Sequence, residues 1–151
     1  CFRPRLVKAF LDTNVLVAGL ASRTGASAAV LDLGEAEEIL ILVSRQVLVE
    51  ADRTILSKFP QLIERYRLFI KNLGPLLIDD PSVAMVQEAK RLIHLNDAPI
   101  LAAAKQGGVD YLVTLNTRHF ATLPAREFLG APILTPAEFL ETFRRYWEHS
   151  A

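Results

Sequence analysis

Cysteine is nearly absent from this chain of 151 residues, because Cys1 is the only one. A single thiol excludes an intramolecular disulfide and a cysteine-rich zinc site. This scarcity favours a reducing compartment, and we expect a cytoplasmic protein. No apolar run approaches the roughly 18 uninterrupted residues that a membrane span needs, which predicts a protein without a membrane partner.

A surplus of charge of either sign is also absent, because 17 basic residues balance 17 acidic ones. The overall charge therefore gives no sign of a nucleic-acid or membrane binder, and a polyanion would need a local basic patch. Hydrophobic residues make up 51% of the chain, which is enough for a substantial core. The length favours one domain over residues 1–151, and the high apolar fraction favours a homodimer.

Short apolar runs alternate along the chain with amphipathic segments. The runs predict strands at 7–11, 39–43, 76–78, 111–115 and 132–134. The segments between them predict helices at 15–20, 26–38, 44–58, 62–73, 83–93 and 100–106. A last helix begins near Thr135 and Pro136, and its aromatic residues are predicted to be core or dimer interface: Phe139, Phe143, Tyr146 and Trp147.

This alternation predicts an α/β domain with three layers, in which a parallel sheet of about five strands has helices on both faces. If the strands at 7–11 and 111–115 are neighbours, the strand order is 3-2-1-4-5, which is the order that we expect. Successive strands are then added toward one edge of the sheet before this point and toward the other edge after it. Ligands bind at such a switch point, beyond the carboxyl ends of the strands.

Asp12 directly follows the first predicted strand, and Thr13 and Asn14 come next. These side chains can be ordinary turn and N-cap residues, because each can bond a free backbone N–H at the start of a helix. A functional site is favoured only if other acids reach the same edge of the sheet. Asn116 follows the fourth predicted strand and would share that edge with Asp12.

Four sequence blocks cover much of the chain in order: FLDTNVLV at 10–17, LVSRQVLVEADRTI at 42–55, NDAPILAAAKQGGVDYLVT at 96–114 and ILTPAEFL at 133–140. Together they resemble the PIN-domain nucleases, and more narrowly the VapC-like ribonuclease toxins of type II toxin–antitoxin pairs. The resemblance implies a single PIN-like α/β domain and a pocket of acidic residues. It also implies a divalent metal, Mg²⁺ or Mn²⁺, and cleavage of single-stranded or structured RNA.

The resemblance also implies roles for particular residues. The metal-binding acids would be Asp12, Glu50 and Asp97. Asn14 would support the first of them, and Thr114 could assist by hydrogen bonding. From the residues alone, Asp97 can instead be an N-cap, and Glu50 can be an exposed residue of a helix face. With the metal bound, water would attack the phosphodiester and leave a 5′-phosphate and a 3′-hydroxyl, as in the family.

Asn116 departs from the family pattern, which usually has a fourth acid after the VT of the fourth strand. An amide is neutral and offers one carbonyl oxygen, so it attracts Mg²⁺ less strongly than a carboxylate. We therefore expect Asn116 in the catalytic set beside the acids, with one tightly held ion. Asp110 cannot replace the missing acid, because it lies at the amino end of the same strand, about 20 Å from Asn116 in an extended chain. We expect a structural role for it.

Arginines near two strand ends could contact substrate phosphates. Arg45 follows the second predicted strand, and Arg118 lies two residues beyond Asn116. A guanidinium at either position can hold a phosphate. His119 could be a general acid, although no second histidine or metal-ligand spacing accompanies it.

Other classes of protein fit these residues less well. A haloacid-type phosphatase needs a second aspartate two residues after the first, where this chain has Asn14. A response-receiver domain needs paired acids after strand one, whereas Asp79 and Asp80 follow strand three. The serious alternative is a PIN-like module that binds RNA or a protein without cutting, because Asn116 has weakened its site. For a toxin we expect an antitoxin that places a hydrophobic helix near the acids.

Overall fold

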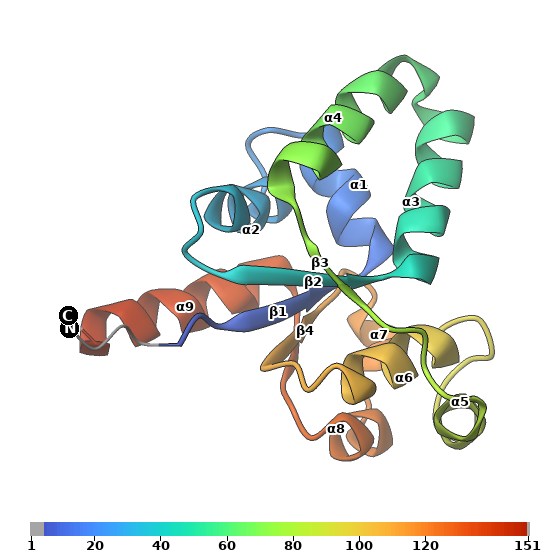
Figure 1. The fold of residues 1–151 in the computed structure, drawn as a ribbon. Helices are drawn as coiled ribbons and strands as arrows, with labels where there is room; N and C mark the ends of the chain where they lie inside the picture. The colour runs from blue at the N-terminus through green and yellow to red at the C-terminus, as the bar shows by residue number, and fades with distance from the viewer. Residues whose placement is uncertain (1–4, 151) are drawn as a thin grey trace.

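The structure is a computed structural model and describes residues 5–150, without the side chains of residues 146, 147, 149 and 150. Its centre is a parallel sheet with helices on both faces (Figure 1). Among the described residues the strands are β1 Lys8–Leu11, β2 Leu40–Ser44, β3 Leu76–Ile78, β4 Tyr111–Val113 and β5 Ile133–Leu134. Their order is β3-β2-β1-β4-β5. The predicted α/β fold and strand order are confirmed.

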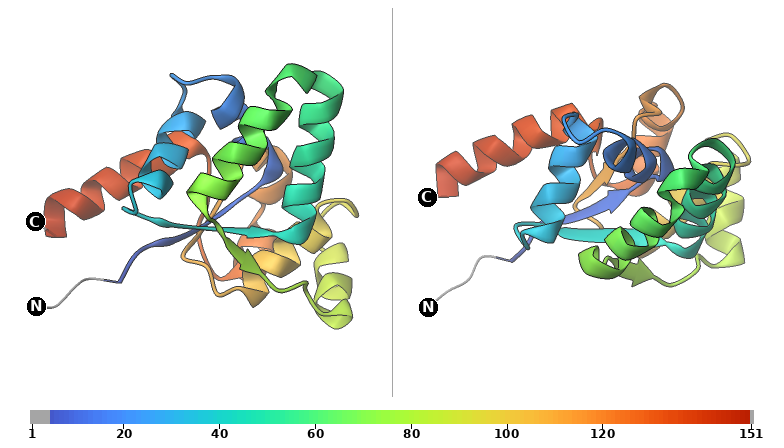
Figure 2. Two further views of the ribbon diagram at one scale, coloured as in Figure 1. Left: turned by 45° about the horizontal axis from the view of Figure 1, so that its top comes forward. Right: turned by 90° about the horizontal axis from the view of Figure 1, so that it is seen from above.

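Helices connect the strands and cover the sheet (Figures 1 and 2). Their bounds are α1 Thr13–Ala21, α2 Ala26–Glu35, α3 Arg45–Lys58, α4 Ile63–Leu73, α5 Val83–Lys90, α6 Ala98–Gln106, α7 Thr117–Phe120, α8 Leu123–Leu129 and α9 Pro136–Ser150, with a 3₁₀ turn η1 at Pro60–Leu62. The helices α1 to α4 lie on one face of the sheet, and α5, α6 and α8 lie on the other. α9 packs against α2 and β5.

Several predicted ends are wrong by a few residues. The helix predicted over 26–38 ends at Glu35, and Glu37 just beyond it has a positive φ of 59°. The helix predicted over 83–93 ends at Lys90, and the one predicted from residue 100 begins at Ala98. The strand predicted over 111–115 ends at Val113, because the next N–H groups, from residue 115 onward, bond to side chains and not to a neighbouring strand.

Two helices between β4 and β5 have no counterpart in the prediction. α7 has 4 residues and α8 has 7, too few for a clear helical periodicity. The Thr122 hydroxyl accepts the N–H of Ala125 and caps the start of α8. Gly130, with a φ of 71°, ends it in the left-handed conformation that glycine adopts without strain.

The core lies between the sheet and its helices, and strand residues such as Phe10, Leu42 and Leu112 are at most 2% exposed. Phe139 and Phe143 of the predicted aromatic face are core and stack on each other. The remaining side chains of that face, at 146 and 147, and Cys1 lie outside the described residues. None of the described helices is by itself both long and apolar enough to cross a membrane; α1 and α2 pass that test only together, as a pair bent by 96°.

α9 begins with a reciprocal cap. The Thr135 hydroxyl accepts the N–H of Glu138 at 3.1 Å, and the Glu138 carboxylate accepts the N–H of Thr135 at 3.0 Å. The bond from the backbone N–H of Thr135, and then its side chain, lower the pKa of Glu138. The cap therefore holds this carboxylate in its ionised form.

Loss of this cap is expected to destabilise the fold. Thr135→Ala should lower the free energy of unfolding by about 1 kcal/mol, measured by urea denaturation. Because the folded-state pKa of Glu138 lies below its unfolded value, its contribution is present above the unfolded pKa and is lost as the pH falls through the folded one. The stability gap between wild type and Glu138→Gln should therefore shrink below about pH 4. A gap that persists there would show that the charge of Glu138 adds nothing to the cap.

Candidate active site

The carboxyl ends of β1 and β4 meet beside a pocket of about 480 Å³. Asp12 follows β1 and Asn116 lies beyond the end of β4, and both line this pocket. Glu50 reaches the pocket from α3, and Asp97, which directly precedes α6, also lines it. The structure thus brings together, at the predicted switch point of the sheet, all the residues of the predicted catalytic set.

Asp12 is the most enclosed of these acids, with 5% of its surface exposed. One carboxylate oxygen accepts the backbone N–H of Thr13 at 2.8 Å. The other accepts the hydroxyl of Thr114 at 2.8 Å and the side-chain amide of Asn14 at 3.3 Å.

The pKa of Asp12 is raised, chiefly because burial disfavours its charged form. The hydrogen bonds from Thr114 and Thr13 oppose this effect, and the nearby carboxylates of Asp97 and Glu50 add to it. A cation in the pocket would offset both the burial and the repulsion. The electrostatics therefore favour cation binding beside Asp12.

The predicted supporting residues tie the chain after β4 to the chain after β1. Thr114 is fully buried; its hydroxyl donates to Asp12 and accepts the N–H of Asn116 at 3.0 Å. The side chain of Asn14 donates to Asp12 and accepts the N–H of Leu115 at 3.1 Å. The segment after β1 and the segment after β4 are thus both held around the carboxylate of Asp12.

Removal of the Thr114 hydroxyl should destabilise the protein. Thr114→Val keeps the shape but leaves Asp12 and the Asn116 N–H without this buried partner, so we expect a loss of about 1–3 kcal/mol in the free energy of unfolding. Thr142→Val is the matched control, since its hydroxyl bonds the Glu138 carbonyl on α9, and it should change stability by less than about 0.5 kcal/mol. Equal effects of the two variants in chemical denaturation would contradict the role of Thr114.

Glu50 faces the pocket with both carboxylate oxygens hydrogen-bonded. The hydroxyl of Thr13 donates to one at 3.0 Å, and the side-chain amide of Gln46 donates to the other at 2.9 Å. Gln46 also donates to the carbonyl of Asn96 at 3.4 Å, which links α3 to the segment before α6. Sequence reasoning missed Gln46. Its spacing of four residues from Glu50, which places both on one helix face, was the available signal.

Asp97 occupies the N-cap position of α6, but its side chain makes no capping hydrogen bond, so the capping alternative is wrong for its carboxylate. That carboxylate lies 3.7 Å from Nδ1 of His119. The side-chain nitrogen of Asn116 lies 3.4 Å from the same ring nitrogen. His119 therefore stands beside the acids, although it does not line the pocket itself.

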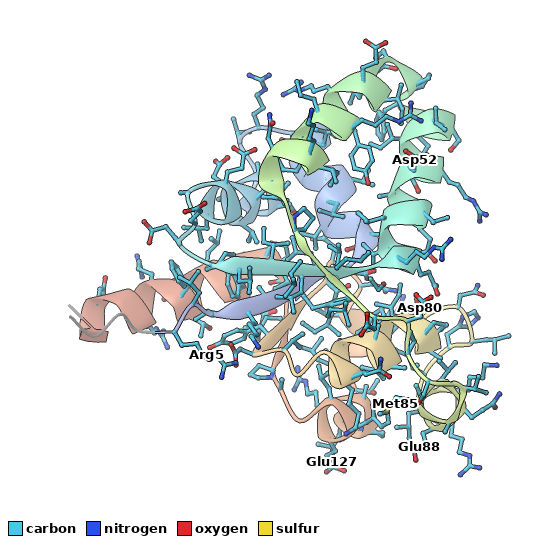
Figure 3. The ribbon with its side chains drawn as sticks, viewed as in Figure 1. Arg5, Asp52, Asp80, Met85, Glu88 and Glu127 are labelled. Atoms are coloured by element: carbon cyan, nitrogen blue, oxygen red, sulfur yellow. The ribbon has the colours of Figure 1, made fainter. Side chains whose placement is uncertain are left out.

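The predicted phosphate contacts do not line this pocket. Arg45 lines a separate hollow between α3 and α4, together with Arg53, Arg67 and Asp52, and Figure 3 labels Asp52 on α3. Arg118 is exposed on α7. Neither guanidinium therefore lines the pocket that holds the acids.

Asp110 lies at the opposite end of β4 from the pocket. Its carboxylate accepts the backbone N–H of Lys8 at 2.8 Å and lies 3.5 Å from the guanidinium of Arg5, which Figure 3 labels. The expectation that Asp110 is structural and does not replace a site acid agrees with these contacts.

The pocket continues away from the acids along residues that sequence reasoning did not single out. These residues are Val17, Ala18 and Ala21 of α1, Thr54 and Lys58 of α3, and Phe59. The available signal was again helical spacing, since Glu50, Thr54 and Lys58 are four residues apart and share a face of α3.

The donor set fits a hard divalent cation in its chemistry, because carboxylates and an amide oxygen line one pocket. Among the side chains that the structure describes, no three from Asp, Glu, His or Cys form a group tight enough to hold an ion together. The arrangement fits an ion that binds directly to one or two carboxylates and keeps several waters, as Mg²⁺ does. Glu50, Asp12 and Asp97 are the residues that could supply those ligands.

This combination defines a class of protein, a doubly wound α/β domain with acids gathered at its switch point. The PIN domain family model matches residues 8–118, and the chain belongs to that family. PIN domains are generally nucleases. A comparison with curated proteins found no match.

Solved structures share this fold at low sequence identity. One such structure is VapBC2 from Rickettsia felis bound to a DNA fragment from the VapBC2 promoter. The matching chain is 20% identical with a TM-score of 0.64, and the match covers 85% of this chain and 97% of that one. DNA-bound VapBC from Salmonella typhimurium is 20% identical with a TM-score of 0.64, over 87% and 99%. FitAcB from Neisseria gonorrhoeae is 20% identical with a TM-score of 0.61, over 85% and 97%. These similarities establish the fold.

Proposed function

We propose that this chain is a metal-dependent endoribonuclease, a VapC-like toxin that hydrolyses phosphodiester bonds of single-stranded or structured RNA. The observation that carries the proposal is the convergence of Asp12, Glu50 and Asp97 on one pocket at the switch point of a PIN fold. Residues 1–151 would act as a single PIN-like domain.

Asp12, Glu50 and Asp97 would hold Mg²⁺ or Mn²⁺ in this pocket. When bound, the cation supplies a water of lowered pKa and positive charge beside the phosphate. The hydrogen bond from the Thr114 hydroxyl fixes the orientation of the Asp12 carboxylate before a cation arrives. Asn116 can accept a hydrogen bond from the attacking water through its side-chain oxygen and so orient that water.

The direct test is cleavage of a labelled single-stranded RNA by the purified protein with Mn²⁺, with Mg²⁺ or with a chelator. We expect cutting with either cation and none with the chelator. The products should carry 5′-phosphate and 3′-hydroxyl ends, because water is the nucleophile. Cutting that persists in the chelator would contradict the metal dependence, and 2′,3′-cyclic ends would contradict attack by water.

A second candidate function is a module of the same fold that binds RNA or a protein without cutting it. Two observations favour it: Asn116 stands where the family usually has an acid, and the described residues contain no tight group of three metal ligands. Binding of RNA without cleavage in either cation would select this function over the nuclease.

Three further properties belong to the proposal. An antitoxin partner is supported by the fold shared with the VapBC structures. A homodimer is supported by Leu76 and Leu77, both at least half exposed on the edge strand β3, and a monomer mass in solution scattering at micromolar concentration would contradict it. A cytoplasmic location and phosphate contacts by Arg45 and Arg118 stay predictions from the sequence.

A further inference from the structure

We infer that the arm of the active-site pocket leading to Lys58 is a subsite for the RNA strand beyond the scissile phosphate. Lys58 would bind a backbone phosphate there, and the apolar wall opposite would receive a base. The inference rests on the proposed function, since it takes the acids as the place where the strand is cut.

The geometry of α3 separates this arm from the acids. Glu50, Thr54 and Lys58 all line the pocket and follow one another at intervals of four residues on one helix face. At a rise of about 1.5 Å per residue, Lys58 stands about 12 Å along the helix from Glu50. This separation of the main chain exceeds two helical turns, so in the proposal the Lys58 ammonium meets the phosphate of a neighbouring nucleotide.

The charge of the arm is suited to a polyanion. Lys58 is the cationic side chain among the described residues that line this pocket. Within the described part of the chain, none of the ion pairs or side-chain hydrogen bonds involves its ammonium group. The ammonium is therefore available to a ligand. A phosphate there also lies far enough from the carboxylates to escape most of their repulsion.

The wall of the arm is apolar and built from small residues. α1 and α3 lie side by side (Figures 1 and 2), and α1 contributes Val17, Ala18 and Ala21 to the pocket. Phe59, directly after Lys58, completes the lining. Unpaired bases of single-stranded RNA pack on aromatic and apolar side chains of this kind.

A structural role for Lys58 gives a different expectation. A lysine in the last turn of a helix stabilises the helix dipole, and Lys58 lies in the last turn of α3. Lys71 likewise lies in the last turn of its helix, α4, but does not line the pocket. Lys71→Ala is therefore a control, because it removes a last-turn lysine from a helix without touching the proposed subsite.

The experiment measures binding of a fluorescent ten-nucleotide single-stranded RNA by anisotropy, in chelator and over a range of salt concentrations. Lys58→Ala should weaken binding roughly fivefold to tenfold at low salt and reduce the slope of log K against log salt by about 0.7, the value for one phosphate contact. Lys71→Ala should leave both quantities as in the wild type. Ala18→Leu, which fills the arm, should weaken binding with the slope retained.

An affinity and a salt slope that are unchanged in Lys58→Ala, or changed equally in Lys71→Ala, would overturn the inference and leave the arm to another occupant, such as a protein segment. Because the assay contains no catalytic metal, it is independent of cleavage. A protein that needs Lys58 for binding but never cuts RNA would keep the subsite and lose the nuclease function. A protein that cuts RNA, and whose RNA binding does not need Lys58, would keep the nuclease function and overturn the subsite.

Discussion

Asp12→Asn should reduce metal-dependent RNA cleavage by at least about a hundredfold. Loss of a residue that merely orients a metal ligand already costs about 10- to 100-fold in affinity or activity, and loss of the ligand itself should cost more. Asp12 accepts three hydrogen bonds, from Thr13, Asn14 and Thr114, whereas Glu50 accepts two. The measurement is the initial rate of cleavage of a labelled RNA at saturating Mn²⁺.

Asp110→Asn is the matched control for this prediction. Asp110 is an acid next to the same pair of strands, but it lies at their amino end and bonds the backbone of Lys8. The control variant should keep the wild-type cleavage rate within about twofold, because no cation is expected there. If Asp12→Asn cuts as fast as Asp110→Asn, Asp12 is not a ligand of the catalytic ion.

The pH dependence of stability shows whether the Asp12→Asn variant is folded. It also shows whether the ionised Asp12 carboxylate destabilises the wild type. Because the folded-state pKa of Asp12 is raised, its stabilising contribution is complete below the unfolded pKa and is lost as the pH rises through the folded one. The metal-free wild type should therefore lose stability relative to Asp12→Asn as the pH rises above about 4. Melting temperatures of both proteins over this range test the sign.

The order of the strands could be predicted because each strand is a short apolar run with a helix pattern on either side. Asp12 and Asn116 could be placed by topology alone, since both follow strands that proved to be neighbours. Glu50 could not. The apolar pattern of α3 is equally compatible with Glu50 in a pocket and with Asp52 in one, and only the family resemblance favoured Glu50.

The structure also shows why the contacts around the acids escaped prediction. Gln46 and Lys58 share a face of α3 with Glu50, but helical spacing identifies that face as functional only after Glu50 is known to meet the pocket. Arg45 follows a strand end as Asp12 does, yet it belongs to another face of α3 and lines a different hollow. Position along the chain fixes the edge of the sheet, whereas the direction of a helical side chain depends on the rotation of its helix.

Asn116→Asp should raise cleavage about tenfold or more at limiting Mg²⁺. A fourth carboxylate adds a charged oxygen ligand to a pocket whose affinity depends on ligand charge. The position tolerates the change, because the Asn116 backbone N–H is held by Thr114 and its side chain makes no helix cap. The gain should appear as a lower Mg²⁺ concentration for half-maximal rate.

The same substitution should destabilise the protein without metal. An added negative charge near Asp12 raises the pKa of that carboxyl further, so the metal-free variant should melt at a lower temperature than the wild type at pH 7. Mg²⁺ should then raise its melting temperature more than it raises that of the wild type, because the cation binds the folded state more tightly. Asn116→Ser, which adds no charge, is the control and should show neither change.

The metal affinity and the maximal cleavage rate of Asn116→Asp together show why the natural protein has an amide at this position. A gain in both metal affinity and maximal rate would mean that the natural protein is a weakened nuclease. A gain in affinity alone would mean that one ion held by Asp12, Glu50 and Asp97 already supports the full rate, and that the fourth acid only helps to retain it. If neither changes, Asn116 acts on the water or the RNA and not on the cation, which would account for an amide next to His119 and Thr114.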